Sequence, residues 1–333
     1  MKVLLICNYR TGVGGISGQV EILQRKLREE GHVAEVFNTK GTVWQRLAMP
    51  RKLRNVAKEY DVLHVHCCSG WGFLPAVMGV NVRKKLGKRV VLTYHGGGGE
   101  RFFDRRPRLV RRVLTRTDAN IVLSEFLAKV FRKHSLPYVV IPNVIELDKQ
   151  RFRLRHPVAP HYICTRAHEE LYNIPCILRA FQSVQETLPD ASLTLVGDGS
   201  RHQQLMRQAE DLNLKNVVFT GRVDNKDIYR YLDQCDIIVS APKADNMPVS
   251  LLEAMNAGLL VVASRVGGVP YLIEDRETGL LFESDNDHDL AEKMLCAVSN
   301  PQQTEEILKK ANQKVCDYRW ENVRNKILSV YGQ

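Results

Sequence analysis

The stretch that decides the fold reads Asp245-Asn246-Met247-Pro248-Val249-Ser250-Leu251-Leu252-Glu253-Ala254-Met255. Pro248 suits the first turn of a helix, where its missing N–H costs nothing, and Gly258 is a typical helix stop. The pattern predicts a helix over 248–257, with Asp245 in the loop before it and Glu253 about a turn and a half inside. The free amides of the first turn suit a diphosphate, and the flanking carboxylates suit sugar hydroxyls. The alternative is an ordinary capped helix whose acids favour the dipole.

The rest of the chain alternates short β-branched runs with amphipathic segments, the pattern of parallel α/β sheets. The first half predicts strands at 2–7, 33–37, 61–66, 89–94, 119–123 and 138–141, and helices at 15–30, 44–59, 70–86, 108–116 and 124–134. The second half predicts strands at 161–165, 192–196, 217–220, 236–240, 259–263 and 280–282, and helices at 174–188, 201–212, 225–233, 248–257, 267–274, 286–299, 302–315 and 318–331. The charged segment 143–158 interrupts this pattern and is interpreted as a linker. We therefore expect two α/β domains, at 1–150 and 151–317, with a ligand in the crevice between them.

Composition supports this organisation. A chain of 333 residues that is 44% apolar and 26% charged is typical of a soluble protein with two domains. The first strand begins almost at Met1, so we expect no signal peptide, and the weakly polar run 71–82 is too short to span a bilayer. Eight cysteines without the spacing of a disulfide framework indicate reduced thiols. These features predict a cytoplasmic protein.

The net charge of +11 is unevenly distributed. Residues 1–150 carry 27 Lys and Arg against 12 Asp and Glu, a net +15, whereas residues 151–333 carry 21 against 25, a net −4. The densest basic segment, 101–112, mixes arginines with apolar residues. It suits an anionic membrane surface, so peripheral attachment at the inner face of the membrane is one hypothesis. Nucleic-acid phosphates and a merely solvated basic face are the alternatives.

Two loops after first-half strands are candidate sites. The run 11–18 follows the first strand, but Ser17 stands where a dinucleotide fingerprint needs its third glycine. The glycines there, Gly14 and Gly15 among them, are interpreted as a bare backbone that a ligand can approach. His95 ends a strand at the edge that faces the ligand crevice, where it can donate a hydrogen bond or only anchor the turn.

Four potential metal ligands occur together at His64, His66, Cys67 and Cys68. The two histidines share one face of a strand while Cys67 points to the other. No second Cys/His cluster completes a zinc site. We therefore predict a structural role here and no metal cofactor.

In the second half the strand ends carry further candidates. Arg166 follows the first strand of that half and can reach a phosphate. Gly197 and Gly199 form the turn after the next strand, and Arg222 and Val223 follow the third, where backbone groups can meet a base edge. Each of these residues is weak evidence for a ligand site, but all of them follow the carboxyl ends of strands, where open α/β sheets bind ligands.

Taken together, these segments resemble the retaining family-4 glycosyltransferases (glycosyl transferases group 1), which have the GT-B fold of two facing Rossmann-like domains. The resemblance covers nearly the whole chain and rests on an ordered set of motifs: the glycine loop, 31–33, 61–66, 93–96, 141–143, 195–199, 245–253, 266–270 and 278–282. It implies an N-terminal acceptor-binding domain completed by the final helix, and a C-terminal domain that binds a nucleotide sugar. It also implies hexosyl transfer with retention of configuration.

The resemblance assigns roles residue by residue. Glu253 matches the acid that binds the ribose, and Asp245 the acid that contacts the donor sugar. The amides of Asn246, Met247, Val249 and Ser250 would bind sugar and diphosphate. His95 matches a histidine that contacts the donor sugar, and Gly14 and Gly15 match the loop that admits acceptor and diphosphate.

This chain departs from the family at Asp245, at Tyr172 and at Tyr271, the last of which stands where a Glu is usual. Asp245 is one methylene shorter than the usual Glu, and Tyr172 stands where a lysine is usual, so Arg166 lacks its second cation. A UDP-sugar is the expected co-substrate, without a metal, and the acceptor is expected to be lipid-linked or a growing cell-surface glycan. The alternatives are an inactive sugar-binding protein of the same fold and, from charge alone, a nucleic-acid-binding protein, although no nucleic-acid partner is expected.

Overall fold

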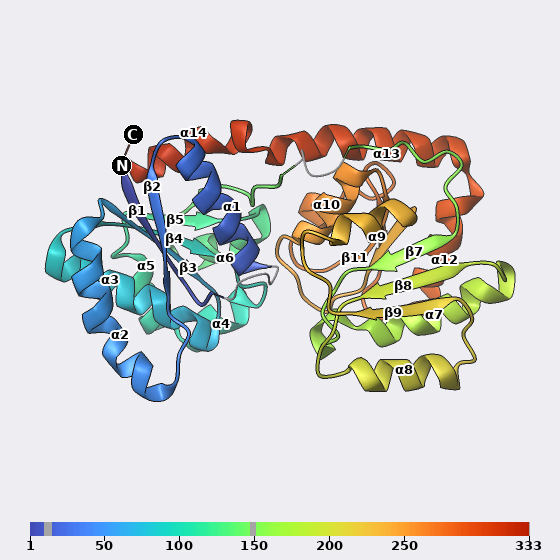
Figure 1. The fold of residues 1–333 in the computed structure, drawn as a ribbon, viewed down its shortest axis with the longest axis horizontal. Helices are drawn as coiled ribbons and strands as arrows, with labels where there is room; N and C mark the ends of the chain where they lie inside the picture. The colour runs from blue at the N-terminus through green and yellow to red at the C-terminus, as the bar shows by residue number, and fades with distance from the viewer. Residues whose placement is uncertain (10–14, 147–150, 333) are drawn as a thin grey trace. The chain divides into compact units, whose positions relative to one another are not determined.

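The computed structural model describes residues 1–9, 15–146 and 151–332. The chain divides into two compact units: unit 1 is Met1–Glu146 with Tyr318–Gln333, and unit 2 is Leu147–Asp317. Each unit is a parallel sheet covered by helices (Figure 1).

Unit 1 is built on a six-stranded parallel sheet in the order β2-β1-β3-β4-β5-β6. Its strands are β1 (Lys2–Cys7), β2 (Val33–Asn38), β3 (Val62–Cys67), β4 (Arg89–Tyr94), β5 (Ala119–Val122) and β6 (Val139–Val140). Its helices are α1 (Ile16–Glu29), α2 (Val43–Val56), α3 (Leu74–Leu86), α4 (Gly99–Arg105), α5 (Pro107–Leu114), α6 (Glu125–Lys133) and α14 (Trp320–Tyr331), with 3-10 turns η1 (Ala57–Glu59) and η2 (Gly70–Phe73).

The strands of unit 1 are apolar on both faces, as a doubly covered sheet requires. Val3 and Leu5 pack with α1 and α14 on one face. Leu4 and Ile6 pack with α2, α3, α5 and α6 on the other. The final helix thus supplies part of the core of the first unit.

Unit 2 has a second six-stranded parallel sheet, in the order β12-β11-β10-β7-β8-β9. Its strands are β7 (His161–Cys164), β8 (Ser192–Val196), β9 (Val217–Gly221), β10 (Ile237–Ser240), β11 (Leu260–Ser264) and β12 (Leu280–Phe282). Its helices are α7 (Ile174–Thr187), α8 (His202–Asp211), α9 (Ile228–Gln234), α10 (Val249–Ala257), α11 (Val269–Leu272), α12 (Asp287–Ser299) and α13 (Pro301–Val315), with 3-10 turns η4 (Glu170–Tyr172) and η5 (Cys316–Tyr318). Helices α7, α8, α12 and α13 share one core with the sheet, while α9 contacts β7 and α10 contacts β11.

Several expected elements differ from those observed. The expected helix 70–86 is divided into η2 and α3, and the helix expected at 267–274 is only the short α11. Helix α4 was not expected, because the glycine run at 96–99 argues against a helix, yet the helix begins at the last of these glycines. Pro248 is not in the first turn but is the N-cap residue before it, and Gly258 ends the helix with φ 81° as expected.

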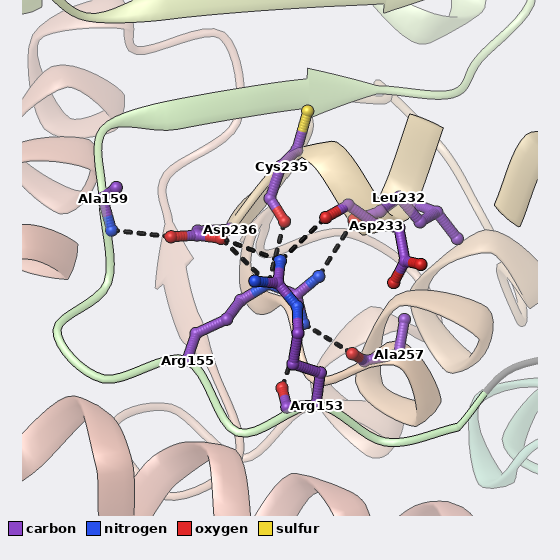
Figure 2. Close-up of polar contacts among 8 residues, drawn as sticks. All are labelled: Arg153, Arg155, Ala159, Leu232, Asp233, Cys235, Asp236 and Ala257. Carbon is purple, nitrogen blue, oxygen red and sulfur yellow. Dashed lines mark hydrogen bonds and ion pairs between the residues drawn. The ribbon is translucent and has the colours of Figure 1, made fainter. Parts of the chain in front are cut away.

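The boundary between the two units falls inside the predicted linker 143–158, but both ends of that segment are packed into a unit. Ile145 donates its backbone N–H to Tyr318 within unit 1. At the other end Arg155 is 3% exposed and forms the centre of a polar cluster in unit 2 (Figure 2). Its guanidinium donates to the carbonyls of Arg153, Leu232, Cys235 and Ala257 and to the carboxylate of Asp236. A charged stretch of sequence is therefore fixed to the ends of α9 and α10.

Candidate functional site

The candidate site of unit 2 lies where its strand order reverses. Strand β7 comes first in the unit, β8 and β9 extend the sheet to one side, and β10, β11 and β12 extend it to the other. The carboxyl ends of β7 and β10 are therefore the two sides of the switch point, where open α/β sheets bind ligands. Arg166 follows β7, and Asp245 follows β10.

Arg166 and Asp245 meet at this point. The guanidinium Nη2 forms an ion pair with the Asp245 carboxylate, and Nη1 donates to Ser250 Oγ at 3.3 Å. The two side chains are 13% and 17% exposed, so the pair is largely removed from water. Because their positions are 79 residues apart in sequence, only the sheet order joins them. The structure thus brings together the arginine and the acid that were predicted separately.

Three further residues act on the same guanidinium. The ring of Tyr172 stacks on Arg166, with 4.5 Å from the guanidinium carbon to the ring centroid. Burial lowers the pKa of Arg166, and the charges of Tyr172, Cys164 and Glu253 oppose that shift. Tyr172, which stands where a second cation was expected, therefore holds the arginine from its face. Glu253 lies close enough for its charge to act on Arg166.

The loop before α10 is held in place by the backbone. Asn246 N–H bonds to the Asp245 carboxylate at 2.8 Å, and Asn246 and Met247 are 3% and 8% exposed. The helix has no side-chain cap at Pro248, so its first-turn amides, those of Val249 and Ser250, keep no such partner. The amides that were expected to bind diphosphate therefore stand at an uncapped helix start beside Arg166.

Glycines allow the loops of unit 2 to pack this closely. A Cβ at Gly267 would lie 2.0 Å from Asp245 O, and one at Gly268 would lie 1.7 Å from Asn246 O. On the other side a Cβ at Gly197 would lie 2.4 Å from Arg166 O, and one at Gly199 would lie 2.5 Å from His168 O. The predicted Gly197 and Gly199 thus serve backbone packing around Arg166. Gly267 and Gly268 likewise allow the backbone to pack closely around Asp245. No role at the site was predicted for these two glycines from the sequence.

Arg222 and Val223 do not join this cluster. They follow β9, the edge strand, which β8 separates from β7. Arg222 is exposed and Val223 is half-buried.

In unit 1, His95 directly follows β4 and belongs to a group of three histidines, of which His64 and His66 are buried and His95 is half-buried. His66 Nδ1 lies 3.0 Å from His95 Nε2, and the two rings stack with centroids 5.3 Å apart. His64, two residues earlier on β3, lies 2.6 Å from the hydroxyl of Tyr331 and 2.7 Å from that of Thr93. The shared face of His64 and His66 was predicted, but the contact of His66 with His95 was not, because it joins two strands.

A cavity of about 40 Å³ adjoins these histidines within unit 1. Gln19 and Leu23 of α1, Ile121 of β5 and Ile327 of α14 line it together with His64, His66 and His95. Burial lowers the pKa of His64 to about 3 and that of His95 to about 4, and it holds the pKa of His66 well below its usual range. All three rings are therefore neutral near pH 7.

Two other expectations concern the first loop and metal binding. Gly15 is the N-cap residue of α1 with φ 69°, which favours glycine, whereas Gly14 lies outside the described residues. Within residues 1–9, 15–146 and 151–332, no group of three or more His, Cys, Asp or Glu side chains has the arrangement of a metal site. In the same ranges no helix is long and apolar enough to cross a membrane.

Comparison with known proteins matches both halves of the chain to family models. Residues 148–315 match Glycosyl transferases group 1, and residues 23–149 match Glycosyltransferase Family 4. An uncharacterized glycosyltransferase of Methanocaldococcus jannaschii is 22% identical, over 100% of this chain and 98% of its own length. The alpha-monoglucosyldiacylglycerol synthase of Streptococcus pneumoniae is 24% identical over 97% and 83%. The phosphatidyl-myo-inositol mannosyltransferase of Mycobacterium tuberculosis is 25% identical over 99% and 96%.

Solved structures show the same fold. The HepE protein of Anabaena, in complex with UDP, superposes with a TM-score of 0.79 at 18% identity over 99% of both chains. The sucrose-phosphate synthase of Thermosynechococcus elongatus gives a TM-score of 0.85 at 17% identity over 99% of this chain and 98% of that one. With its two parallel-sheet units and its family matches, this chain is a GT-B glycosyltransferase of the glycosyl transferases group 1 family.

Proposed function

We propose that this protein transfers a hexose from a UDP-sugar to an acceptor with retention of anomeric configuration. The observation that carries the proposal is the meeting of Arg166, Asp245 and the uncapped start of α10 at the switch point of unit 2. An arginine and free helix amides suit a diphosphate, and the neighbouring carboxylates suit hydroxyl groups. The structure of HepE in complex with UDP supports uridine as the base.

In this proposal the ion pair of Arg166 with Asp245 marks the place of the ligand. An entering diphosphate takes the guanidinium, and Asp245 is then released to accept hydrogen bonds from the donor sugar. As the bond to the sugar breaks, negative charge grows on the departing diphosphate. Arg166 and the amides of Val249 and Ser250 stabilise that charge without reorganisation, so the proposal includes no metal cofactor. Glu253 binds the ribose hydroxyls.

A thermal-shift screen over UDP-, GDP- and ADP-sugars tests the donor. A ligand present at 100 times its dissociation constant stabilises a protein by about 2.7 kcal/mol. We expect the UDP-sugars to raise the melting temperature most. A larger shift with GDP- or ADP-sugars would contradict uridine, and no shift with any of them would contradict the donor site.

Glu253→Ala should weaken binding of the best nucleotide sugar about tenfold, because the two hydroxyls of the ribose lose their acceptor. Calorimetric titration measures this change. Glu292→Ala, an exposed acid on α12, is the matched control and should bind as the wild type does. Equal affinity of the wild type and Glu253→Ala would remove Glu253 from the site. Donor binding without any turnover would favour the alternative of an inactive binding protein.

For the acceptor we propose a lipid-linked molecule at an anionic membrane. Arg101, Arg105, Arg106, Arg108, Arg111 and Arg112 are all exposed. The 3-10 turn η2 packs against α4 through Phe73 and Phe102, whose ring centroids are 5.2 Å apart, and it carries Trp71, which is 85% exposed. An exposed tryptophan beside a segment with six exposed arginines suits the interface of a membrane. The names of the pneumococcal synthase and the mycobacterial mannosyltransferase, both of which refer to lipids, support the same class.

Vesicles with and without anionic lipid test this surface by co-sedimentation. We expect binding to anionic vesicles at low salt, release at high salt, and a loss of about tenfold in the triple variant Arg105→Ala/Arg108→Ala/Arg112→Ala. The control removes three exposed cations from unit 2, Arg207→Ala/Lys215→Ala/Arg230→Ala, and should bind as the wild type does. If the wild-type protein did not co-sediment with anionic vesicles at low salt, the membrane proposal would be wrong. Steeply salt-dependent binding to duplex DNA would favour a nucleic-acid partner instead.

A further inference from the structure

His66 has no role in the proposed transfer, yet its ring contacts the ring of His95. It lies on β3 with 4% of its surface exposed, and its Nδ1 faces Nε2 of His95 at 3.0 Å. Its other ring nitrogen, Nε2, is buried and has no hydrogen-bond partner among the described residues. A buried polar atom without a partner calls for an explanation.

The contact between the two rings requires one proton. Because burial keeps both histidines neutral near pH 7, each ring carries one N–H. A 3.0 Å contact between two ring nitrogens is a hydrogen bond only if one of them donates and the other accepts. The tautomer of His95 is therefore tied to that of His66.

The surroundings of His66 Nε2 decide the direction. Polar Gln19, Thr93 and Asn143 line the adjoining cavity together with apolar Leu23, Ile121 and Ile327, yet this buried nitrogen has no partner among the described residues. A buried N–H without an acceptor is rarer in proteins than an acceptor without a donor. His66 thus carries its proton on Nδ1 and leaves Nε2 as a lone pair.

We propose that His66 is a positioning residue that fixes His95 in the tautomer protonated at Nδ1. Nε2 of His95 then accepts from His66 and is not available as a base. Nδ1, for which the described part of the chain provides no hydrogen-bond partner, presents an N–H to a ligand. The assignment of that ligand to the donor sugar rests on the proposed function, whereas the tautomer itself does not.

The tautomer can be measured directly in the wild-type protein. Protein labelled with ¹⁵N-histidine is observed by long-range ¹H–¹⁵N correlation at pH 7.5, where protonated and unprotonated ring nitrogens differ widely in chemical shift. The signals of His95 and His66 are assigned from the His95→Gln and His66→Asn variants. We expect both rings to be protonated at Nδ1. A His95 ring protonated at Nε2, or a cationic ring, would overturn the proposal without any substitution.

Variants at position 66 supply the second test. His66→Leu removes the donor, so His95 should revert to the Nε2–H form that free histidine favours. His66→Asn keeps an amide N–H where Nδ1 lay and should retain the wild-type tautomer. The matched control is His64→Leu, which alters a histidine of the same strand and burial that bonds to Tyr331 and Thr93 instead of His95. The ring centroid of His64 lies 4.3 Å from that of His66, so small changes of chemical shift are expected, but His95 should remain protonated at Nδ1.

Turnover provides a further comparison once a donor is known. We expect kcat to fall about tenfold in His66→Leu, with KM for the donor nearly unchanged, and to recover in His66→Asn. Unchanged His95 signals in a folded His66→Leu variant would refute the positioning role. A protein that transfers no sugar but shows the expected tautomers would contradict the proposed function and not this inference.

Discussion

Arg166→Ala should lower kcat for sugar transfer by about 100- to 1,000-fold, the usual cost of losing one preorganised group that stabilises developing charge. The guanidinium is a largely buried cationic group at the switch point of unit 2, and Tyr172 stands where the family commonly has a second cation. Arg166→Lys keeps the charge but loses the planar donors that reach both Asp245 and Ser250, so it should recover only part of the activity. Steady-state kinetics with the best UDP-sugar measure both effects.

The control for this prediction is Arg179→Ala. Arg179 is 41% exposed and pairs with Asp287 on the surface of unit 2, so its loss should leave kcat within about twofold of wild type. Thermal melts of all three variants separate loss of catalysis from loss of folding. If Arg166→Ala folded and turned over at the wild-type rate, the diphosphate would have to bind elsewhere.

Arg155→Ala should destabilise unit 2 by about 3–5 kcal/mol, the range measured when one partner of a buried ion pair is removed. The substitution takes one guanidinium from the cluster of Figure 2 and leaves four backbone carbonyls and the Asp236 carboxylate without that donor. Asp236 is itself 8% exposed, so water cannot readily replace the lost contacts. Urea denaturation followed by circular dichroism measures the change, since Trp44, Trp71 and Trp320 all belong to unit 1 and their fluorescence does not report on unit 2.

A neighbouring arginine offers a matched comparison. Arg153 donates to the Asp233 carbonyl and to Asp236, but its side chain is 52% exposed. Arg153→Ala should therefore cost less than about 1 kcal/mol. If Arg153→Ala and Arg155→Ala lowered the free energy of unfolding by similar amounts, burial would not be what makes Arg155 important for stability.

The α/β fold could be predicted because strand patterns and helix ends are both encoded by residues close together in the sequence. Short apolar runs such as 3–7 alternate with amphipathic helices, and glycines such as Gly258 end helices where they were expected. The site of unit 2 was also predictable in part, since Asp245 and Glu253 lie on either side of one helix start. What could not be predicted depends on neighbouring strands. The pairing of Arg166 with Asp245 requires β7 beside β10, and that of His66 with His95 requires β3 beside β4.

Arg155 illustrates a different limit. A charged segment with a proline resembles a linker, because composition reports that charge is present but not where it is buried. The signal that could have found it is indirect: Gly258 must be a glycine not only to end α10 but also because a Cβ there would lie 2.2 Å from Arg153 O. The close packing of Gly258 against the backbone of Arg153 shows that the segment around Arg153 is held against the end of α10.

The place of α14 in the core of unit 1 has a consequence for biosynthesis. Trp320, Val323, Ile327 and Tyr331 are each at most 5% exposed and pack with Val3 and Leu5. These residues are translated after all of unit 2, so the core of the first unit can close only after the second unit has been synthesised. Until then β1 keeps one apolar face partly uncovered, while unit 2 already has all of its strands. The nascent chain therefore completes its second unit before its first, the reverse of the usual N-terminal-first order.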